Sequence, residues 1–592
     1  MTLISRFAQA AKPKVYTIRY PRKLLAGKPL LYLSSASASL GDALLGYSQG
    51  LTAAFQVQPS FIRRIYGKHV TIKQIKDGTT GIHPLQPAIL IVCLAIPAIF
   101  AALFSAYLSD SLGRRTTIRI GALLYLIASC IQMIAPDFAT LIAGRSIQGL
   151  GAGILSTTVP IFQVEIAPVG ARGMLAGLEA LCMNVGYAAS AWVGYAFFVN
   201  AHAEHSWRGP LAVQAAVSLV LVICSFLLPE SPRFLIQHGF KTEGLRTLAD
   251  LHARGDVTDE GVNQTYCAIV VTLEMERCAG DGTGAVAPWR AVRNYPRRTL
   301  IGTTSRMFAQ FNGINAILHF LPEHLAQAGF DIPHALFFTG CSALVYSLGP
   351  LPAILFIDKL GRRRFLIVGS IALACALTLI GSLQLYVDHW PKMFAYFDGA
   401  RGVFIGMSLY LFFFGATWGP VPWLLSAELF PLRMRAKGMA LSTASDWFFE
   451  CVVGLTSRPL FDALNGAYYF LLAGACVFSG LIVWRGYVET SGKPLEAIAG
   501  MFGDAPPRKI EQEDAVLRVR RRRVQGRSTV SMTSQITAVA SSTVGTSSQI
   551  TLQPPADTAQ VKRSMDVEKN AEAAPAARAA QVDMEKDTNK AA

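Results

Sequence analysis

Charge is scarce in this chain. Of its 592 residues only 16% are Asp, Glu, Lys or Arg, whereas 52% are hydrophobic. Soluble domains carry about 25% charged residues, so the composition argues against a soluble multi-domain protein and predicts one with many membrane-spanning helices. Acids are the rarer sign, since 38 Asp and Glu stand against 54 Lys and Arg.

The sequence signatures of an enzyme or a metalloprotein are also missing. There is no phosphate-binding loop, nucleophile elbow or metal-ligand spacing, and most of the ten cysteines fall inside hydrophobic runs. We therefore expect no enzymatic activity, no cofactor and no metal site. Nucleic acid is not an expected partner either, because a membrane topology with basic cytoplasmic segments accounts for the positive charge.

What the chain does have is long apolar runs. About 20 apolar residues cross a bilayer as a helix, and the predicted fold is an all-α integral membrane protein with twelve transmembrane helices. The predicted spans are 32–56, 86–109, 118–135, 139–163, 174–199, 210–228, 299–321, 335–357, 365–387, 401–427, 437–461 and 466–487.

The distribution of Lys and Arg predicts the orientation of these spans. The first 30 residues contain basic residues but no acid, and the 229–298 loop and the C-terminal tail, with Arg520–Arg523, are basic as well. Positive segments stay on the cytoplasmic side, so both termini are expected there, in a protein of the plasma membrane. The 57–85 loop is an exception, because it is basic on the predicted outer side.

A short charged motif occurs twice. Asp110-Ser-Leu-Gly-Arg114-Arg115 in the first half returns as Asp358-Lys-Leu-Gly-Arg362-Arg363 in the second. Such a motif suits a tight turn between two helices, where arginines reach acids and helix C-terminal carbonyls. Its recurrence marks a duplicated membrane domain of two six-helix bundles, the layout of major facilitator transporters.

The duplication divides the chain into five predicted segments. They are a cytoplasmic N-terminal segment (1–30), an N-terminal bundle (31–228), a central cytoplasmic loop (229–298), a C-terminal bundle (299–488) and a cytoplasmic tail (489–592). Within the loop, 241–254 and 264–278 have helical spacing. Most of the tail is rich in Ser, Thr and Ala, with almost no aromatics, and is expected to be disordered.

A second pair of charges repeats with the first. Glu165 and Arg172 return at the same spacing as Glu428 and Arg435. We interpret these charges as a gating network at the cytoplasmic face rather than as substrate ligands. Its predicted members are Asp110, Arg114, Arg115, Glu165, Arg172, Asp358, Arg362, Arg363, Glu428 and Arg435.

Four further segments resemble the sugar porter family of the major facilitator superfamily, in particular its fungal-type members. They are Gly144-Arg145-Ser-Ile-Gln-Gly149-Leu-Gly-Ala-Gly153, Pro229-Glu-Ser-Pro-Arg233, Gln310-Phe-Asn-Gly-Ile-Asn315 and Gly419-Pro420-Val-Pro422-Trp423. The resemblance covers about residues 30–495 and implies a carrier with a substrate site between its two bundles.

The resemblance assigns substrate contacts to the seventh and tenth spans. The family pattern Gln-Gln-x-Ser-Gly-x-Asn is matched by Gln310 and Asn315, whereas its first Gln is Ala309 here, and His319 stands at a common Tyr position. Trp423 matches the family's sugar-stacking and gating tryptophan. Neutral amides and an aromatic face suit a substrate with many hydroxyl groups.

Departures from the family pattern introduce acids. The span 11 pattern Asn-Trp-x-x-x-Asn reads Asp446-Trp447-Phe-Phe-Glu450, and the span 5 Gln is replaced by Ala180, preceded by Glu179. Acids within a span are costly and by default functional. Asp446 and Glu450 are four residues apart and hence lie on one helical face. They could accept hydrogen bonds from a polyol, attract a cationic substrate or bind a proton. The alternative is that one of them is a protonated acid with a purely structural role.

Proton coupling is left open by the sequence. Proton symporters of the family carry Gly-Tyr-Asp in span 1, where this chain has Gly46-Tyr47-Ser48, and the acid's usual partner matches Arg145. A buried arginine needs a counter-ion, yet Asp42 lies on a different helical face from Ser48. The candidates for coupling are therefore Asp42, Arg145, Asp446 and Glu450.

Together these features predict a transmembrane carrier of a sugar, a polyol or a related polyhydroxy compound, working by alternating access. Its expected partners are that small molecule, the lipid bilayer and, if transport is coupled, protons, and the protein is expected to be a monomer. Two alternatives stay open: a transporter-like nutrient receptor that signals through its tail, and a carrier of a cyclic hydroxy acid or an organic cation.

Overall fold

A computed structural model of the chain describes residues 26–68, 85–200, 205–278, 292–293, 295–389, 399–431, 434–491 and 501–502. The chain divides into two units, Met1–Val519 and Arg520–Ala592, and every described residue belongs to the first. Most of the predicted N-terminal segment and of the tail, including Arg520–Arg523, lies outside the described residues.

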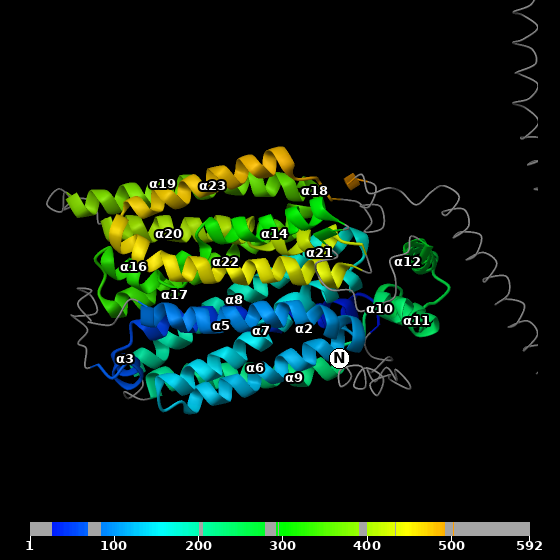
Figure 1. Cartoon of the computed structure of the whole chain (residues 1–592), viewed down its shortest axis with the longest axis horizontal. Coiled ribbons are helices and arrows are strands. Elements are labelled where there is room, and N and C mark those ends of the chain that lie inside the picture. Colours follow the sequence, from blue (N-terminus) through cyan, green and yellow to red (C-terminus); the bar gives the residue numbers. More distant parts are fainter. Residues whose placement is uncertain are drawn as a thin grey trace, which may run out of the picture. The chain divides into compact units, whose positions relative to one another are not determined.

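The first half contains a helix at each predicted span. The helices are α2 (Lys28–Gln56), α5 (Leu85–Leu112), α6 (Arg114–Ile134), α7 (Phe138–Ile166), α8 (Arg172–Asn200) and α9 (His205–Leu227). They lie side by side in Figure 1, with α2 against α8 and α7 between α5 and α6.

Glycines explain why α7 lies so deep in this half. A Cβ atom on Gly149 or Gly153 would overlap the carbonyl oxygens of Leu94 and Ala98 on α5. Small residues let helix backbones approach closely in membranes. The glycine-rich segment recognised in the sequence is therefore a packing surface on which α5 rests.

In the second half three predicted spans are divided into shorter helices. The helices are α14 (Pro296–Phe311), α15 (Ile314–Leu318), α17 (Ile332–Leu348), α18 (Pro350–Leu360), α19 (Arg362–His389), α20 (Gly399–Ala416), α21 (Pro420–Leu429), α22 (Arg435–Leu464) and α23 (Ala467–Gly486). The predicted runs 299–321, 335–357 and 401–427 are thus interrupted, a feature that hydropathy did not reveal.

Each interruption has a local cause. Gly313 adopts φ +98°, a left-handed conformation that ends α14 before α15 begins. Pro350 and Pro420 lack the N–H that would continue a helix, so α18 and α21 each begin at a proline.

Shorter helices lie outside the spans. They are α3 (Pro59–Ile65), α10 (Pro232–Gln237), α11 (Lys241–His252), α12 (Glu260–Cys278), α16 (Leu321–Gln327) and a 3-10 turn (Val169–Ala171). The expected helices 241–254 and 264–278 correspond to α11 and α12, which project with α10 from one end of the helical bundle in Figure 1. Helices α3, α10 and α16 were not anticipated.

Side-chain exposure fits a protein immersed in lipid. Large apolar side chains such as Phe100, Ile134 and Leu355 are more than 60% exposed, as expected where lipid replaces water. Eight helical segments of the described chain are long and apolar enough to span a bilayer. Helices α2, α8, α14 and α22 are not among them, and these four carry the polar residues of the cavity described below.

The two halves meet along several helices. Helix α22 of the second half packs against α5, and α8 of the first half packs against α17 and α18. The five predicted segment boundaries stay predictions, because the unit Met1–Val519 contains both halves without a division.

We predict that Gly313→Ala destabilises the protein by about 1–2 kcal/mol, the cost of a left-handed backbone at a residue with a Cβ. The new Cβ would also lie 2.8 Å from Cδ1 of Leu472. The measurement is the thermal unfolding midpoint of the purified protein. Gly474→Ala on α23 is the matched control, because nothing lies within 4 Å of a Cβ there. Equal midpoints for both variants would contradict this account of the break.

Candidate functional site

A cavity with an empty volume of about 840 Å³, including the space where it opens to solvent, lies between the two halves. Helices α2 and α8 line it from the first half, and α14, α15, α21 and α22 line it from the second. Ala180 and Ala309, which stand where the family pattern has glutamines, both face this space.

The break between α14 and α15 is held by hydrogen bonds to Asn312. Its backbone carbonyl accepts from the Tyr410 hydroxyl at 2.8 Å, and its side-chain Oδ1 accepts from Ser479 at 3.0 Å. Asn312 is therefore a support, and the residues on either side of it, Gln310 and Asn315, are left to face the cavity.

A chain of hydrogen bonds links three of the predicted substrate-binding residues. Asn315 Nδ2 donates to Gln310 Oε1 at 2.8 Å, and Gln310 Nε2 donates to Asp446 Oδ1 at 2.9 Å. Asn315 also accepts from Gln49 of α2 at 3.5 Å, across the boundary between the halves. The structure thus brings Gln310, Asn315 and Asp446 together as a row of polar atoms that hydroxyl groups could join.

Arg306 completes this row and was missed in the sequence. Its guanidinium forms an ion pair with Asp446 Oδ2 at 3.3 Å and lies 3.5 Å from the ring centre of Trp423. A cation over an aromatic face is a favourable contact when both groups are shielded from water. The signal was available, because Arg306 is a charged residue within a predicted span, three positions before Ala309.

Trp423 is half-buried and lines the cavity from α21, as the resemblance implied. With Arg306 held on one part of its ring, the remaining indole surface is the aromatic wall available to a substrate. The other acid of α22, Glu450, also lines the cavity, and its Oε1 lies 3.4 Å from His319 Nε2. Asp446 and Glu450 therefore share a helical face but have different partners.

Arg145 lies in a separate small cavity beside this one. Among the described residues its guanidinium donates to neutral oxygens only, those of Ser48 at 3.2 Å, Gln148 at 3.4 Å and Thr52. Glu450 and His319 line the same cavity. A buried arginine is expected to pair with an acid, yet no acid contacts Arg145 among the described residues. The Ser48 hydroxyl accepts a hydrogen bond from Arg145 at the position where the family has Asp.

The first copy of the charged motif forms a buried ion-pair cluster. Arg114 Nε is 3.0 Å from Glu165 Oε2, and its backbone N–H donates to Glu230 Oε1 at 2.9 Å. The Ser231 hydroxyl donates to Glu165 at 2.5 Å. Gly113, with φ +90°, turns the chain against Glu230. Burial raises the pKa of Glu230, and the peptide N–H groups of Ser231, Arg115 and Arg114 oppose that rise.

The second copy repeats these contacts. Arg362 pairs with Glu428 at 3.1 Å and Asp358 at 2.9 Å, while its backbone N–H donates to Glu489 at 2.9 Å. Thr490 donates to Glu428 at 2.9 Å, as Ser231 does to Glu165. Glu489 and Thr490, which follow the last span of the second half, therefore correspond to Glu230 and Ser231, which follow the last span of the first.

The last arginine of each motif caps the final helix of its half. Arg115 donates to the carbonyl of Phe226 in α9 at 2.9 Å, and Arg363 donates to the carbonyl of Trp484 in α23. Both carbonyls belong to the last turn of their helices, where unpaired acceptors and the helix dipole favour a cation.

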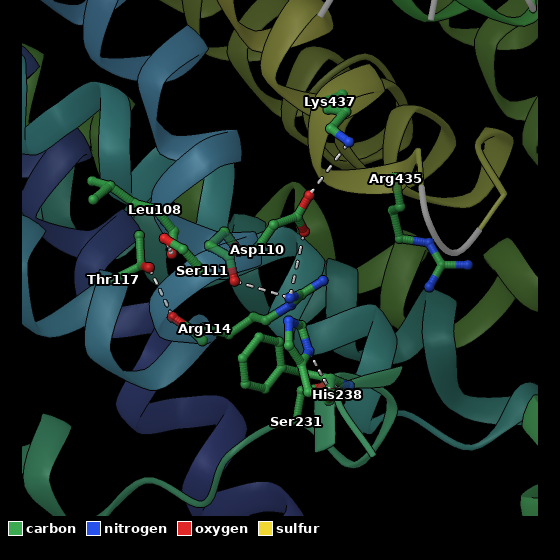
Figure 2. Close-up of polar contacts among 12 residues, drawn as sticks. Leu108, Asp110, Ser111, Arg114, Thr117, Ser231, His238, Arg435 and Lys437 are labelled. Carbon is green, nitrogen blue, oxygen red and sulfur yellow. Dashed lines mark hydrogen bonds and ion pairs between the residues drawn. The ribbon is translucent and has the colours of Figure 1, made fainter. Parts of the chain in front are cut away.

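Contacts between the halves join the two copies at this end of the bundle. Figure 2 shows Asp110 reaching Lys437 of α22, at 3.9 Å, as well as Arg114, at 3.7 Å. Arg435 of α22 is 3.8 Å from Glu165. On the other side Asp358 accepts from the backbone N–H groups of Gly173 and Met174, both at 3.2 Å.

These contacts define a closed end, which we call the turn end. Every predicted member of the gating network lies there, and Arg172 is buried beside the others with 2% of its surface exposed. The gating role itself stays a prediction. Glu165 is notable because one carboxylate contacts both Arg114 of its own half and Arg435 of the other.

A family described as "Sugar (and other) transporter" matches residues 35–502. The "Probable glucose transporter rco-3" of Neurospora crassa is 29% identical over 481 residues, 78% of this chain and 77% of that protein. The "H(+)/hexose cotransporter 1" of Parachlorella kessleri is 28% identical over 476 residues, 78% of this chain and 86% of its own.

Among solved structures, the proton:xylose symporter XylE bound to 6-bromo-6-deoxy-D-glucose superposes with a TM-score of 0.67 at 22% sequence identity. The match covers 80% of this chain and 99% of that one. This likeness shows the fold, an all-α integral membrane protein of twelve transmembrane helices in two six-helix bundles. The predicted fold class is confirmed.

We predict that Glu165→Gln lowers stability by about 3–5 kcal/mol, because it leaves buried Arg114 and Arg435 without their shared carboxylate. Asp110→Asn is the matched comparison. Its side chain is 24% exposed and its ion pairs are 3.7 Å and 3.9 Å long, so that loss should stay below about 1 kcal/mol.

The thermal unfolding midpoints of the two purified variants give the measurement. The account requires a clearly larger decrease for Glu165→Gln than for Asp110→Asn. An equal decrease in both variants would mean that Glu165 stabilises the turn end no more than Asp110 does.

Proposed function

The chain belongs to the family of sugar (and other) transporters, and we propose that it carries a sugar, a polyol or a related polyhydroxy compound across a membrane by alternating access. The observation that carries this proposal is the row of polar atoms formed by Asn315, Gln310 and Asp446 beside Trp423. A polyhydroxy compound offers both donors and acceptors to such a row.

The position of the row supports a site that opens to alternate sides. Gln310, Asn315 and Trp423 belong to the second half, whereas the opposite wall of the cavity is formed by α2 and α8 of the first. Rocking of two bundles about a central site is the usual transport movement of this architecture. In this structure the turn end is closed, so access from that side requires Lys437 and Arg435 to leave Asp110 and Glu165.

The cellular setting follows from the same chemistry. A multi-pass membrane protein needs an orientation, and the basic first 30 residues place the termini, with the turn end, on the cytoplasmic side. We propose the plasma membrane as its location and the monomer as its working unit, since one chain supplies both walls of the cavity. The relevant partners are the substrate and the lipid bilayer.

The other predicted interpretations receive less support. A transporter family gives no ground for an enzymatic activity. A nutrient receptor that signals through its tail is not favoured, because the described chain contains both the cavity and the two copies of the charged motif that a carrier needs. Deleting residues 505–592 separates the two functions: a carrier keeps its uptake, whereas a receptor loses its signal and shows no uptake in the intact chain.

The proposal is tested by uptake of labelled hexoses, pentoses and polyols in transporter-null cells that express the full chain. Saturable uptake of at least one compound supports it. No uptake of any compound, with the protein shown at the cell surface, contradicts it.

For the compound that is taken up, Gln310→Ala should raise the half-saturation concentration about tenfold, the equivalent of one net hydrogen bond of about 1.4 kcal/mol. Gln264→Ala is the matched control, because Gln264 is an exposed glutamine on α12. The initial rate of uptake against concentration gives both values. An unchanged half-saturation concentration in Gln310→Ala would remove Gln310 from the site.

A further inference from the structure

Two acids of the cavity stand out because no ion pair forms with either of them among the described residues. Asp42 of α2 is 2% exposed and Glu179 of α8 is 6% exposed, and both line the cavity. Within the described part of the chain, neither carboxylate forms an ion pair, and the buried Oδ2 of Asp42 has no hydrogen-bond partner. An ionised carboxylate left in this way inside a membrane protein is strongly disfavoured.

The packing of α2 against α8 places these two acids beside each other. A Cβ on Gly46 would overlap the carbonyl oxygen of Met183, and one on Gly50 would overlap Ser190 further along. The two helices therefore run in the same direction at close range. Asp42 is one turn before Gly46, and Glu179 is one turn before Met183, so the two carboxyl groups face the same level of the cavity.

The charges that surround this pair come from three helices. Helix α8 contributes Cys182, α14 contributes Arg306, and α22 contributes Asp446 and Glu450. Arg306 is the one cation in this set, and its ion pair is with Asp446. Glu450 is taken up by His319. Asp42 and Glu179 therefore share with Asp446 the electrostatic attraction of one guanidinium, that of Arg306.

Arg145 does not supply the missing charge. Its guanidinium bonds to Ser48, Gln148 and Thr52 in the neighbouring small cavity, which Asp42 and Glu179 do not line. Among the described residues Arg145 thus forms no ion pair with Asp42, in agreement with the different helical face on which the sequence placed Asp42.

We propose that Asp42 and Glu179 form a proton-binding pair, which shares one proton in this state and exchanges it with water as the two halves move. Neighbouring carboxylates titrate as a unit, because the second negative charge is resisted by the first. The proton arrives from water on one side, binds a carboxylate oxygen, and leaves to water on the other side. No other bond is made or broken.

A proton fits the pair better than an organic cation does. Oδ2 of Asp42 is fully buried, so an ammonium group could reach it only after the helices separate, whereas a proton needs no space. Coupling to transport has a direct physical route. Asp42 and Glu179 belong to the first half and Arg306 belongs to the second, so rocking changes their separation, and with it the stabilisation of the ionised pair.

This inference deepens the proposed function and rests on it only for the coupling to substrate. The first test needs no substrate. Infrared difference spectra of the full-length protein in lipid nanodiscs are recorded between about pH 5 and about pH 9, a range in which an ordinary exposed Asp or Glu stays ionised. The signal is the C=O band of a protonated carboxyl group that disappears as pH rises.

Asp42→Asn and Glu179→Gln should each remove that band, since either change leaves one carboxyl group of the pair without the neighbouring negative charge that resists its ionisation. Asp137→Asn is the matched control. Hydrogen bonds from Thr140 hold the pKa of the exposed Asp137 below its usual value, so its removal should leave the band in place. A band that persists in both variants, or no titrating band in the unaltered protein, overturns the proposal.

A second test uses a compound that the unaltered protein transports. Asp42→Asn and Glu179→Gln should abolish accumulation that an uncoupler dissipates, yet retain exchange of labelled for unlabelled compound across the membrane. Uncoupler-sensitive accumulation that survives in both variants overturns the proposal, as does displacement of the infrared band by tetramethylammonium. If the unaltered protein transports no sugar or polyol, that result contradicts the proposed function. The infrared experiment still tests the proton-binding pair, because it needs no substrate.

Discussion

Burying charge in a lipid-embedded bundle is the constraint on which the rest of this structure depends. Ionised side chains away from water must be paired or neutralised by a proton, and this chain has few charges to place. They gather at two levels, the turn end and the cavity. At the turn end Arg114 pairs with Glu165 and Arg362 pairs with Glu428. In the cavity the acids outnumber the cations, and the imbalance gives that level its chemistry.

The charged residues of the turn end form contacts both within each half and between the two halves. Within each half the contacts are short, such as the 3.0 Å between Arg114 and Glu165. The side-chain contacts between halves are longer, at 3.8 Å for Arg435 with Glu165 and 3.9 Å for Lys437 with Asp110. Since attraction falls with distance, a movement that separates the halves breaks the longer contacts first. Each half then keeps its own cluster as a rigid unit.

Much of this arrangement was predictable from the sequence, because it depends on local patterns. Apolar runs identified the spans, and the repeated Asp–Gly–Arg–Arg motif identified the duplication. The family resemblance pointed to Gln310, Asn315 and Asp446 as substrate contacts, and the structure brings these three together. The breaks before Ile314, Pro350 and Pro420 were missed, because hydropathy averages over a run and does not register the φ of one glycine.

The cavity's charges were harder to predict because they depend on which helices touch. Arg306 lies outside the matched motif, and its two partners come from α21 and α22. By the family pattern the position facing Arg145 is Ser48, and no partner for Asp42 followed from the sequence. Its actual neighbour, Glu179, is set by the close approach of α2 and α8 at Gly46 and Gly50, which tertiary packing alone decides. Polar residues that face the cavity also lower the hydropathy of the helices that carry them. Helices α2, α8, α14 and α22 are therefore the ones that hydropathy identifies least clearly as membrane spans.

The central claim is that this chain moves a polyhydroxy compound through a cavity open to one side at a time. Counterflow in liposomes reconstituted with the purified protein tests it most directly. Liposomes loaded with an unlabelled hexose or polyol are diluted into a trace of the labelled compound. An alternating-access carrier predicts a transient accumulation of label above equilibrium, because the outward flow of unlabelled compound returns carriers to the outside. Label that enters no faster than into protein-free liposomes, across the whole set of compounds, would contradict the account.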